Sequence, residues 1–194
     1  MRFINVRFSL EAIPLSRSAA VQDRDAIKTA IERNVRAVSA RPSVGQGTAV
    51  TKVRWSHGLT CEAQDGPWNF TVGMTDKYGG DNAGPNPGVF GRTALGACLT
   101  IGYAMWAARM NVPLRSLQVE VHADYDVRGE LGIDDSVRPG YKAMRVIVAI
   151  ESDAPESEVA AMLDVADRHS SYLDDYRNPV PVTRELRFAA AAPA

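Results

Sequence analysis

A long apolar segment, residues 87–110, constrains the fold of this chain more than any other part of the sequence. Asn86, just before it, is a good helix N-cap, and Pro87 occupies the first helical position, where its missing N–H removes no hydrogen bond. An Asn-Val-Pro sequence follows Met110 and is expected to end the helix. The segment therefore predicts one helix over residues 87–110.

Small residues follow one face of this predicted helix. At about 100° per residue, Gly91, Ala94, Cys98 and Gly102 share that face. Each glycine disfavours an isolated helix by about 1 kcal/mol relative to alanine. Such residues indicate that another backbone comes close, so the pattern predicts a second element packed on this face, with Cys98 in the contact.

The helix does not have the features of a membrane span. Its most apolar part lies between Arg92 and Arg109 and is shorter than the roughly 20 residues that cross a bilayer. At the start of the chain, Arg7 interrupts the apolar run that a secretory signal requires. We therefore expect a buried core helix in an intracellular, cytoplasmic protein that does not associate with membranes.

Composition argues against several classes of function. Lys plus Arg is 22 and Asp plus Glu is 23, so no basic excess predicts nucleic-acid binding. The two cysteines, Cys61 and Cys98, are expected to be reduced in a chain without an export signal. His57, His122 and His169 lie far apart in the sequence without metal-ligand spacing, so we predict no metal and no cofactor.

An amphipathic helix is expected from about residue 24 to residue 40, with Asp23 as its N-cap. Apolar residues recur along it at spacings of four, four and three, which places them in one stripe: Ile27, Ile31, Val35 and Val38. Residues 41–47 contain proline and glycine and end this helix. We therefore divide the chain into an N-terminal extension, residues 1–47, and a main domain, residues 48–194.

The main domain has the pattern of strands and helices that is typical of an α+β fold. Apolar–polar alternation and an Asp65-Gly66 turn predict a β-meander within residues 48–74. Further elements are expected after the long helix: strands over residues 117–127, 143–150 and 180–188, a hairpin at residues 126–129 and a helix that opens at residues 153–156.

Several short motifs occur in the order and at the separations typical of one protein family. They are Gly79-Gly80, Gly84-Pro85-Asn86-Pro87, Ala94-Leu95-Gly96-Ala97-Cys98, Asp126-Val127-Arg128-Gly129 and Pro139-Gly140-Tyr141. Over residues 48–188 the chain therefore resembles the OsmC/Ohr family of peroxide-stress proteins.

The resemblance implies an α+β, OsmC-like fold, in which antiparallel sheets wrap around long central helices in an intertwined homodimer. It also implies that a thiolate at Cys98 reduces organic hydroperoxides. In catalytic members of the family, an arginine from the early strands lowers the pKa of this thiol. A glutamate orients the arginine, and a second cysteine resolves the sulfenic acid.

Cys98 needs a neighbouring group to ionise it at neutral pH. It lies about ten residues into its helix, so the N-terminal end of the helix dipole contributes little. Arg92 is a poor candidate, because six positions place it about 120° away around the helix. Arg54 and His57 lie in the region where the family's arginine falls, and the sequence does not choose between them.

Two departures from the family pattern affect the predicted chemistry. Gly88 stands where the resemblance implies a glutamate, and Ser170 stands where it implies the second cysteine. A serine forms no disulfide with a sulfenic acid, so a peroxidase cycle resolved within the chain is not expected.

Three hypotheses follow. The first is an enzyme in which Cys98 reduces an organic hydroperoxide and an external thiol regenerates it. The second is a non-catalytic OsmC-like scaffold that binds a small apolar ligand at the dimer interface, with Cys98 as a buried packing residue. The third is a structural dimer whose helix at residues 24–40 docks a partner.

Overall fold

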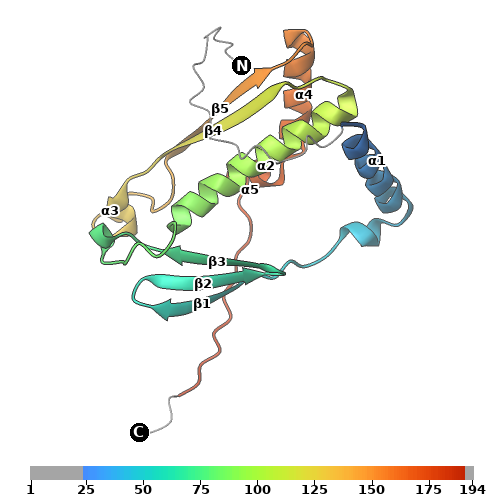
Figure 1. The fold of residues 1–194 in the computed structure, drawn as a ribbon. Coiled ribbons are helices and arrows are strands. Elements are labelled where there is room, and N and C mark those ends of the chain that lie inside the picture. Colours follow the sequence, from blue (N-terminus) through green and yellow to red (C-terminus); the bar gives the residue numbers. More distant parts are fainter. Residues whose placement is uncertain (1–23, 191–194) are drawn as a thin grey trace.

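The computed structural model describes residues 24–190, which form two antiparallel sheets and several helices (Figure 1). One sheet has the order β1-β2-β3 and the other pairs β4 with β5. The strands are β1 (Lys52–His57), β2 (Thr60–Asp65), β3 (Trp68–Gly73), β4 (Ser116–Asp124) and β5 (Ala143–Glu151). The helices are α1 (Arg24–Ala40), α2 (Pro87–Met110), α3 (Val127–Glu130), α4 (Glu156–Arg168) and α5 (Ser171–Arg177), with short 3-10 turns η1 (Pro42–Gly45) and η2 (Asp76–Tyr78). The α+β expectation is confirmed.

The long helix α2 has the predicted bounds and lies at the centre of the molecule (Figure 1). The side chain of Asn86 accepts a hydrogen bond from the N–H of Val89 at 3.1 Å, as an N-cap does. Asn111, in the left-handed region with φ of 59°, ends the helix. Helices α1, α4 and α5 and strand β4 all contact α2. None of the helices within residues 24–190 is long and apolar enough to cross a bilayer.

The hydrophobic core lies on one side of α2. Leu95, Leu99 and Tyr103 are spaced one turn apart and are almost fully buried against Met162 and Leu163 of α4. The inward-facing residues of the β4–β5 pair complete this core: Leu117, Val119, Val121, Met144, Val146, Val148 and Ile150. This spacing of four along α2 explains why the helix holds α4 and the sheet together.

The β1-β2-β3 sheet lies near the N-terminal half of α2, away from the β4–β5 pair (Figure 1). Phe70 of β3 and Phe90 of α2 connect the two through an edge-to-face contact with ring centroids 6.1 Å apart. Much of the rest of this sheet is open, since Trp55 is 72% exposed and Trp68 is 67% exposed. A single chain therefore leaves large apolar side chains of this sheet uncovered.

Helix α1 has the bounds that the apolar stripe predicted, and it packs on α2. Ile27 and Ile31 are half-buried, whereas Val35 and Val38 are exposed, so only the first half of the stripe is covered. The predicted capping residue, Asp23, and the start of the chain lie outside the described residues. Residues 46–51 then lead to β1 without helix or strand.

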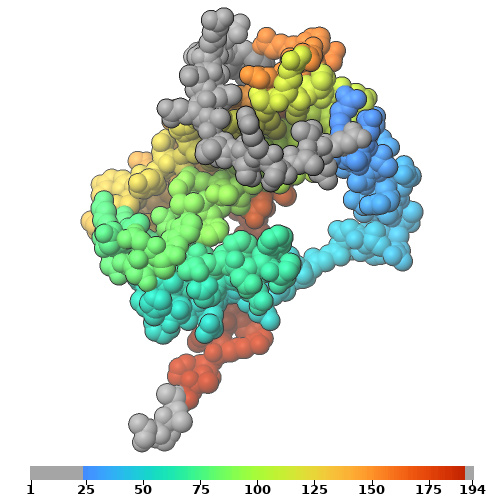
Figure 2. All heavy atoms as spheres, in the orientation of Figure 1, coloured from blue at the N-terminus to red at the C-terminus, as the bar shows by residue number. Residues whose placement is uncertain are grey.

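The strand predicted over residues 180–188 does not form in the single chain, so this prediction is wrong for the isolated chain. The segment is extended and exposed, with Val182, Leu186 and Phe188 each more than four-fifths accessible. Figure 2 shows it, in red, projecting beyond the β1-β2-β3 sheet. A strand needs a hydrogen-bonded neighbour, and no edge strand of the described residues pairs with this segment.

The hairpin expected at residues 126–129 is also wrong, because these residues begin the short helix α3. The Asp126 side chain accepts the N–H of Arg128 and caps this helix. A Cβ at Gly129 would collide with the carbonyl oxygen of Val137, so the close approach of the two backbone segments requires glycine here.

Candidate functional site

The Cys98 side chain lies where α2 meets the start of α5. Its sulfur is 3.5 Å from the hydroxyl oxygen of Ser170 and 3.7 Å from that of Ser171. The residue is half-buried, so its side chain is partly shielded from water but can still be reached by a small molecule from solvent. The predicted contact on the small-residue face of α2 is therefore present, and its partner is α5.

That small-residue face is only partly covered. At Gly91 a Cβ would lie 3.3 Å from the hydroxyl oxygen of Tyr176, whereas nothing lies within 4 Å at Gly102. The neighbouring Ile101 is 61% exposed and Met105 is 39% exposed. Helix α5 therefore covers the face from Gly91 to Cys98, and the next turns of α2 present apolar side chains to the outside.

Ser170 is positioned to donate a hydrogen bond to the sulfur. It is the N-cap of α5, and its hydroxyl oxygen accepts the N–H of Leu173 at 3.3 Å. Because the oxygen is an acceptor in that contact, its own proton remains available for Sγ of Cys98. Ser170 is only 8% exposed, which limits competition from water for this proton.

The surroundings of the sulfur lower its pKa. Burial raises the pKa of the Cys98 thiol, but hydrogen bonds from the Ser170 hydroxyl, the Tyr172 N–H and the Ser171 hydroxyl and N–H lower it, and the net shift is downward. These donors stabilise the thiolate because each directs a positive hydrogen at the charged form. The first turn of α5 thus provides a set of neutral donors to Cys98.

A stacked pair of aromatic rings holds the residue that precedes this site. The His169 ring stacks on Trp106 of α2 with centroids 5.0 Å apart, and the Arg109 guanidinium lies 4.1 Å from the centre of the Trp106 ring. This stacking fixes the junction between α4 and α5 on α2. It therefore positions Ser170, the next residue, against Cys98.

The two cations proposed from the sequence lie on the β1-β2-β3 sheet. Arg54 is on β1 opposite Glu62, and His57, at the end of the same strand, contacts the Asp81 carboxylate at 2.9 Å. Within the described residues, no hydrogen bond or ion pair joins either of them to Cys98. Their role as activating groups stays a prediction.

Among the described residues, Arg92 forms a hydrogen bond with a tyrosine and none with the Cys98 sulfur. Its guanidinium donates to the hydroxyl of Tyr141 at 3.0 Å, and that hydroxyl donates to the Gly88 carbonyl oxygen at 3.2 Å. A Cβ at Gly88 would meet both the Arg92 guanidinium and the Tyr141 hydroxyl. A contact between Tyr141 and Arg92 therefore lies against Gly88, the position where the resemblance implies a glutamate.

Sequence reasoning identified Cys98 and Ser170 but missed the groups beside them. It gave no role to Ser171 or to the Tyr172 N–H. The available signal was the Ser170-Ser171 pair itself, since a serine N-cap leaves the next N–H groups pointing outward. Among the described residues, no cluster of three or more His, Cys, Asp or Glu side chains has the arrangement of a metal site.

Comparisons with known proteins identify the family and the fold. A family model described as OsmC-like protein matches residues 79–185. An OsmC-like protein from Mycoplasma pneumoniae has a TM-score of 0.60 and 13% sequence identity, and the match covers 69% of this chain and 90% of that one. No curated protein matches the sequence.

Two further solved structures share the fold. The organic hydroperoxide resistance protein OsmC of Legionella pneumophila has a TM-score of 0.52 and 17% identity over 68% of this chain and 90% of its own. A putative osmotic stress induced and detoxification response protein of Psychrobacter arcticus has a TM-score of 0.53 and 14% identity over 67% and 89% of the two chains. At such identities, the likeness concerns the fold.

Proposed function

Because this chain belongs to the OsmC-like protein family, we propose that it is a peroxide-stress protein that reduces organic hydroperoxides through Cys98. The observation that carries this proposal is the set of hydroxyl and N–H donors around the Cys98 sulfur, which lowers its pKa. The Legionella pneumophila structure, which is described as an organic hydroperoxide resistance protein, supports the choice of substrate class.

The proposed reaction oxidises the sulfur by two electrons and reduces the peroxide. The Cys98 thiolate attacks the outer oxygen of the hydroperoxide, the O–O bond breaks, and the alkoxide takes up a proton and leaves as the alcohol. The sulfur becomes a sulfenic acid. An external thiol then displaces water to form a mixed disulfide, and a second thiol releases the Cys98 thiolate and the oxidised reductant.

The Ser170 hydroxyl supports the first step of this cycle but not the last. It stabilises the attacking thiolate by donating a proton at 3.5 Å. It offers no sulfur to the sulfenic acid, so regeneration requires a thiol from outside the chain. We place this activity in the cytoplasm, where low-molecular-weight thiols keep cysteines reduced.

We propose further that the working unit is a homodimer. One chain leaves Val53, Trp55 and Trp68 of the first sheet exposed, together with the extended segment at residues 180–188. Large apolar side chains exposed in this number are typical of protein interfaces. In such a dimer, Arg54 or His57 is the cation that we propose to complete the environment of Cys98.

Peroxide consumption with a thiol reductant tests the proposed enzyme. We expect wild-type protein to consume cumene hydroperoxide in the presence of a small dithiol, and Cys98→Ser to lose this activity completely. Cys61→Ser is the matched control, because Cys61 lies on β2 and is expected to be dispensable. Absence of turnover in the wild type with several thiol reductants would refute the proposal.

The alternative is a non-catalytic scaffold that binds a small apolar ligand at the dimer interface. It is favoured by Gly88, where a Tyr141–Arg92 contact replaces the glutamate that the resemblance implies. Rates of Cys98 alkylation over a pH series separate the two functions. A pKa near the ordinary cysteine value of about 8.5, together with no sulfenic acid after peroxide treatment, would favour the scaffold.

A further inference from the structure

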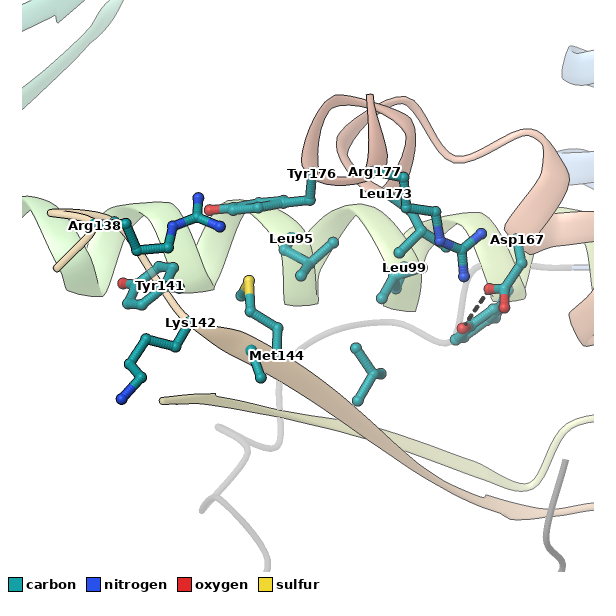
Figure 3. Close-up of a pocket in the computed structure, with 14 residues that line it drawn as sticks. Leu95, Leu99, Arg138, Tyr141, Lys142, Met144, Asp167, Leu173, Tyr176 and Arg177 are labelled. Carbon is teal, nitrogen blue, oxygen red and sulfur yellow. Dashed lines mark hydrogen bonds between the residues drawn. The ribbon is translucent and has the colours of Figure 1, made fainter. Parts of the chain in front are cut away.

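Tyr103 of α2 is a buried tyrosine whose hydroxyl group reaches out of the core to a carboxylate. The residue is 3% exposed, and its hydroxyl donates a hydrogen bond to the Asp167 side chain at 2.7 Å (Figure 3). Burial, followed by this hydrogen bond, raises the pKa of Tyr103, so the phenol stays protonated and keeps donating. The pair therefore links α2 to the last turn of α4.

A cavity lies beside this link, so the hydrogen bond determines where Asp167 lies more than close packing does. The cavity has a volume of about 680 Å³ between α2, β5 and α5, and Tyr103, Asp167 and Arg177 are among its lining residues (Figure 3). A group next to open space has no contacting atoms on that side to fix it. The Tyr103 hydroxyl therefore restrains the carboxylate that it contacts.

Asp167 in turn restrains the backbone just before α5. Its carbonyl oxygen accepts the N–H of Ser170 at 3.4 Å. The Ser170 hydroxyl then lies 3.5 Å from Sγ of Cys98. Cys98 and Tyr103 are five residues apart on one helix, which is about 7.5 Å along a rigid axis. The series Tyr103–Asp167–Ser170–Cys98 is thus attached to α2 at both of its ends.

The contact between Ser170 and the sulfur depends on how the start of α5 is held. Helix α5 has 7 residues and is too short to be stable in isolation, so its contacts with α2 set its position. The stack of His169 on Trp106 is a second anchor for the same junction. Because this anchor remains when the Tyr103 hydroxyl is absent, that hydroxyl adjusts the placement of Ser170 and is not needed to keep α5 docked.

We propose that Tyr103 is a positioning residue for Cys98: by holding Asp167, it keeps Ser170 where its hydroxyl donates to the sulfur. Tyr103 acts through Ser170, and within the described residues it forms no hydrogen bond with Cys98. This inference rests on the thiol chemistry proposed above, since it matters for function only if the Cys98 thiolate reacts.

Tyr103→Phe tests the proposal, because it removes the hydroxyl and keeps the aromatic ring in the core. We expect the pKa of Cys98 to rise, so that alkylation by iodoacetamide at neutral pH slows by about threefold in a Cys61→Ser background. The whole curve of rate against pH should move to higher pH and reach the same plateau. A change in stability alone would lower the melting temperature without moving this curve.

A double variant shows whether Tyr103 acts through Ser170. In Ser170→Ala the donor is already absent, so adding Tyr103→Phe should leave the curve where Ser170→Ala alone places it. Asp167→Ala breaks the same hydrogen bond from the other side and should also move the curve to higher pH. Loss of a carboxylate by itself would move it to lower pH, so this direction is specific to the positioning role.

Tyr141→Phe is the matched control, because it also removes a tyrosine hydroxyl, but one that contacts Gly88 and Arg92 near the start of α2. It is expected to keep the wild-type curve. The inference is overturned if the curve of Tyr103→Phe coincides with that of wild type, or if the effects of Tyr103→Phe and Ser170→Ala add.

Peroxide turnover, measured on the same proteins, separates the two proposals. Wild-type protein that shows the shift on Tyr103→Phe but consumes no cumene hydroperoxide would refute the peroxidase and support the positioning of the thiol. Wild-type turnover with an unshifted curve for Tyr103→Phe would refute the positioning role alone.

Discussion

At the scale of single residues, the proposed function depends mainly on Cys98 and Ser170. They are 72 positions apart in the sequence and 3.5 Å apart in space. Where the resemblance implies a second thiol, this chain has a hydroxyl that donates to the first one. The substitution therefore removes a resolving group and at the same time adds a stabilising donor for the thiolate.

Ser170→Ala tests the donor role. Removing the hydroxyl takes away a hydrogen bond to the charged form of Cys98, so the pKa of the thiol rises and less thiolate is present at neutral pH. We expect alkylation by iodoacetamide at neutral pH to slow by about threefold to tenfold. Ser170→Thr, which keeps a hydroxyl and an N-cap, should restore most of the rate; equal rates in wild type and Ser170→Ala would contradict this role.

Ser170→Cys tests the position itself. A thiol at residue 170 lies beside Cys98, so the sulfenic acid formed by peroxide should condense with it to an intrachain disulfide. Mass spectrometry after treatment with cumene hydroperoxide should show a Cys98–residue 170 cross-link in a Cys61→Ser background. Persistence of the sulfenic acid without a cross-link would show that the two positions do not meet during the reaction.

At the scale of elements, Asp81 connects the first sheet to the loop that precedes α2. Its carboxylate contacts His57 at the end of β1 at 2.9 Å, and it accepts the hydroxyl of Thr60 on β2 at 2.8 Å. The hydrogen bond from His57, then that from Thr60, lowers the pKa of Asp81 from 3.8 to about 2. The loop is thereby tied to the turn between β1 and β2.

Asp81→Asn should change the dependence of stability on pH. Because the folded-state pKa of Asp81 is depressed, its contribution is present above the unfolded value of 3.8 and is lost as the pH falls towards about 2. Thermal denaturation should therefore show wild type more stable than Asp81→Asn above this window, with the difference shrinking inside it. A difference that is constant through the acid range would contradict this assignment.

Element boundaries were predicted well where the signals are local. The bounds of α2 follow from its Asn-Pro start and its Asn-Val-Pro end, and those of α1 follow from its apolar spacing. The prediction failed at residues 126–129 and 180–188. In the first case a side-chain cap produced a short helix, and in the second the strand has no partner edge in the described chain.

At the scale of the whole molecule, residues 24–190 are unevenly packed. The core is concentrated where α2 meets α4 and the β4–β5 pair, whereas the first sheet and the last segment remain exposed. Val182, Leu186 and Phe188 are apolar and fall on the same side of that extended segment, as residues on one face of a paired strand do. This pattern supports the proposal that a second copy provides the missing edge.

Leu186→Glu combined with Phe188→Glu should disrupt the proposed homodimer. Two charges on the apolar face of the segment would have to be desolvated in the interface, which is strongly unfavourable. Size-exclusion chromatography with light scattering should give a dimer for wild type and a monomer for the variant. Arg187→Gln, on the alternate side of the segment, is the control and should remain dimeric; a monomeric wild type would refute the dimer itself.

The sequence by itself determined the central helix, the α+β class, the family resemblance and the choice of Cys98 as a candidate residue, because caps, periodicity and motif order are local properties. Only the tertiary structure decided which groups surround the sulfur. Ser170 meets Cys98 through the packing of α5 on α2. Contacts between residues so distant in the chain depend on how the elements pack, and the sequence pattern does not encode that packing in any single segment.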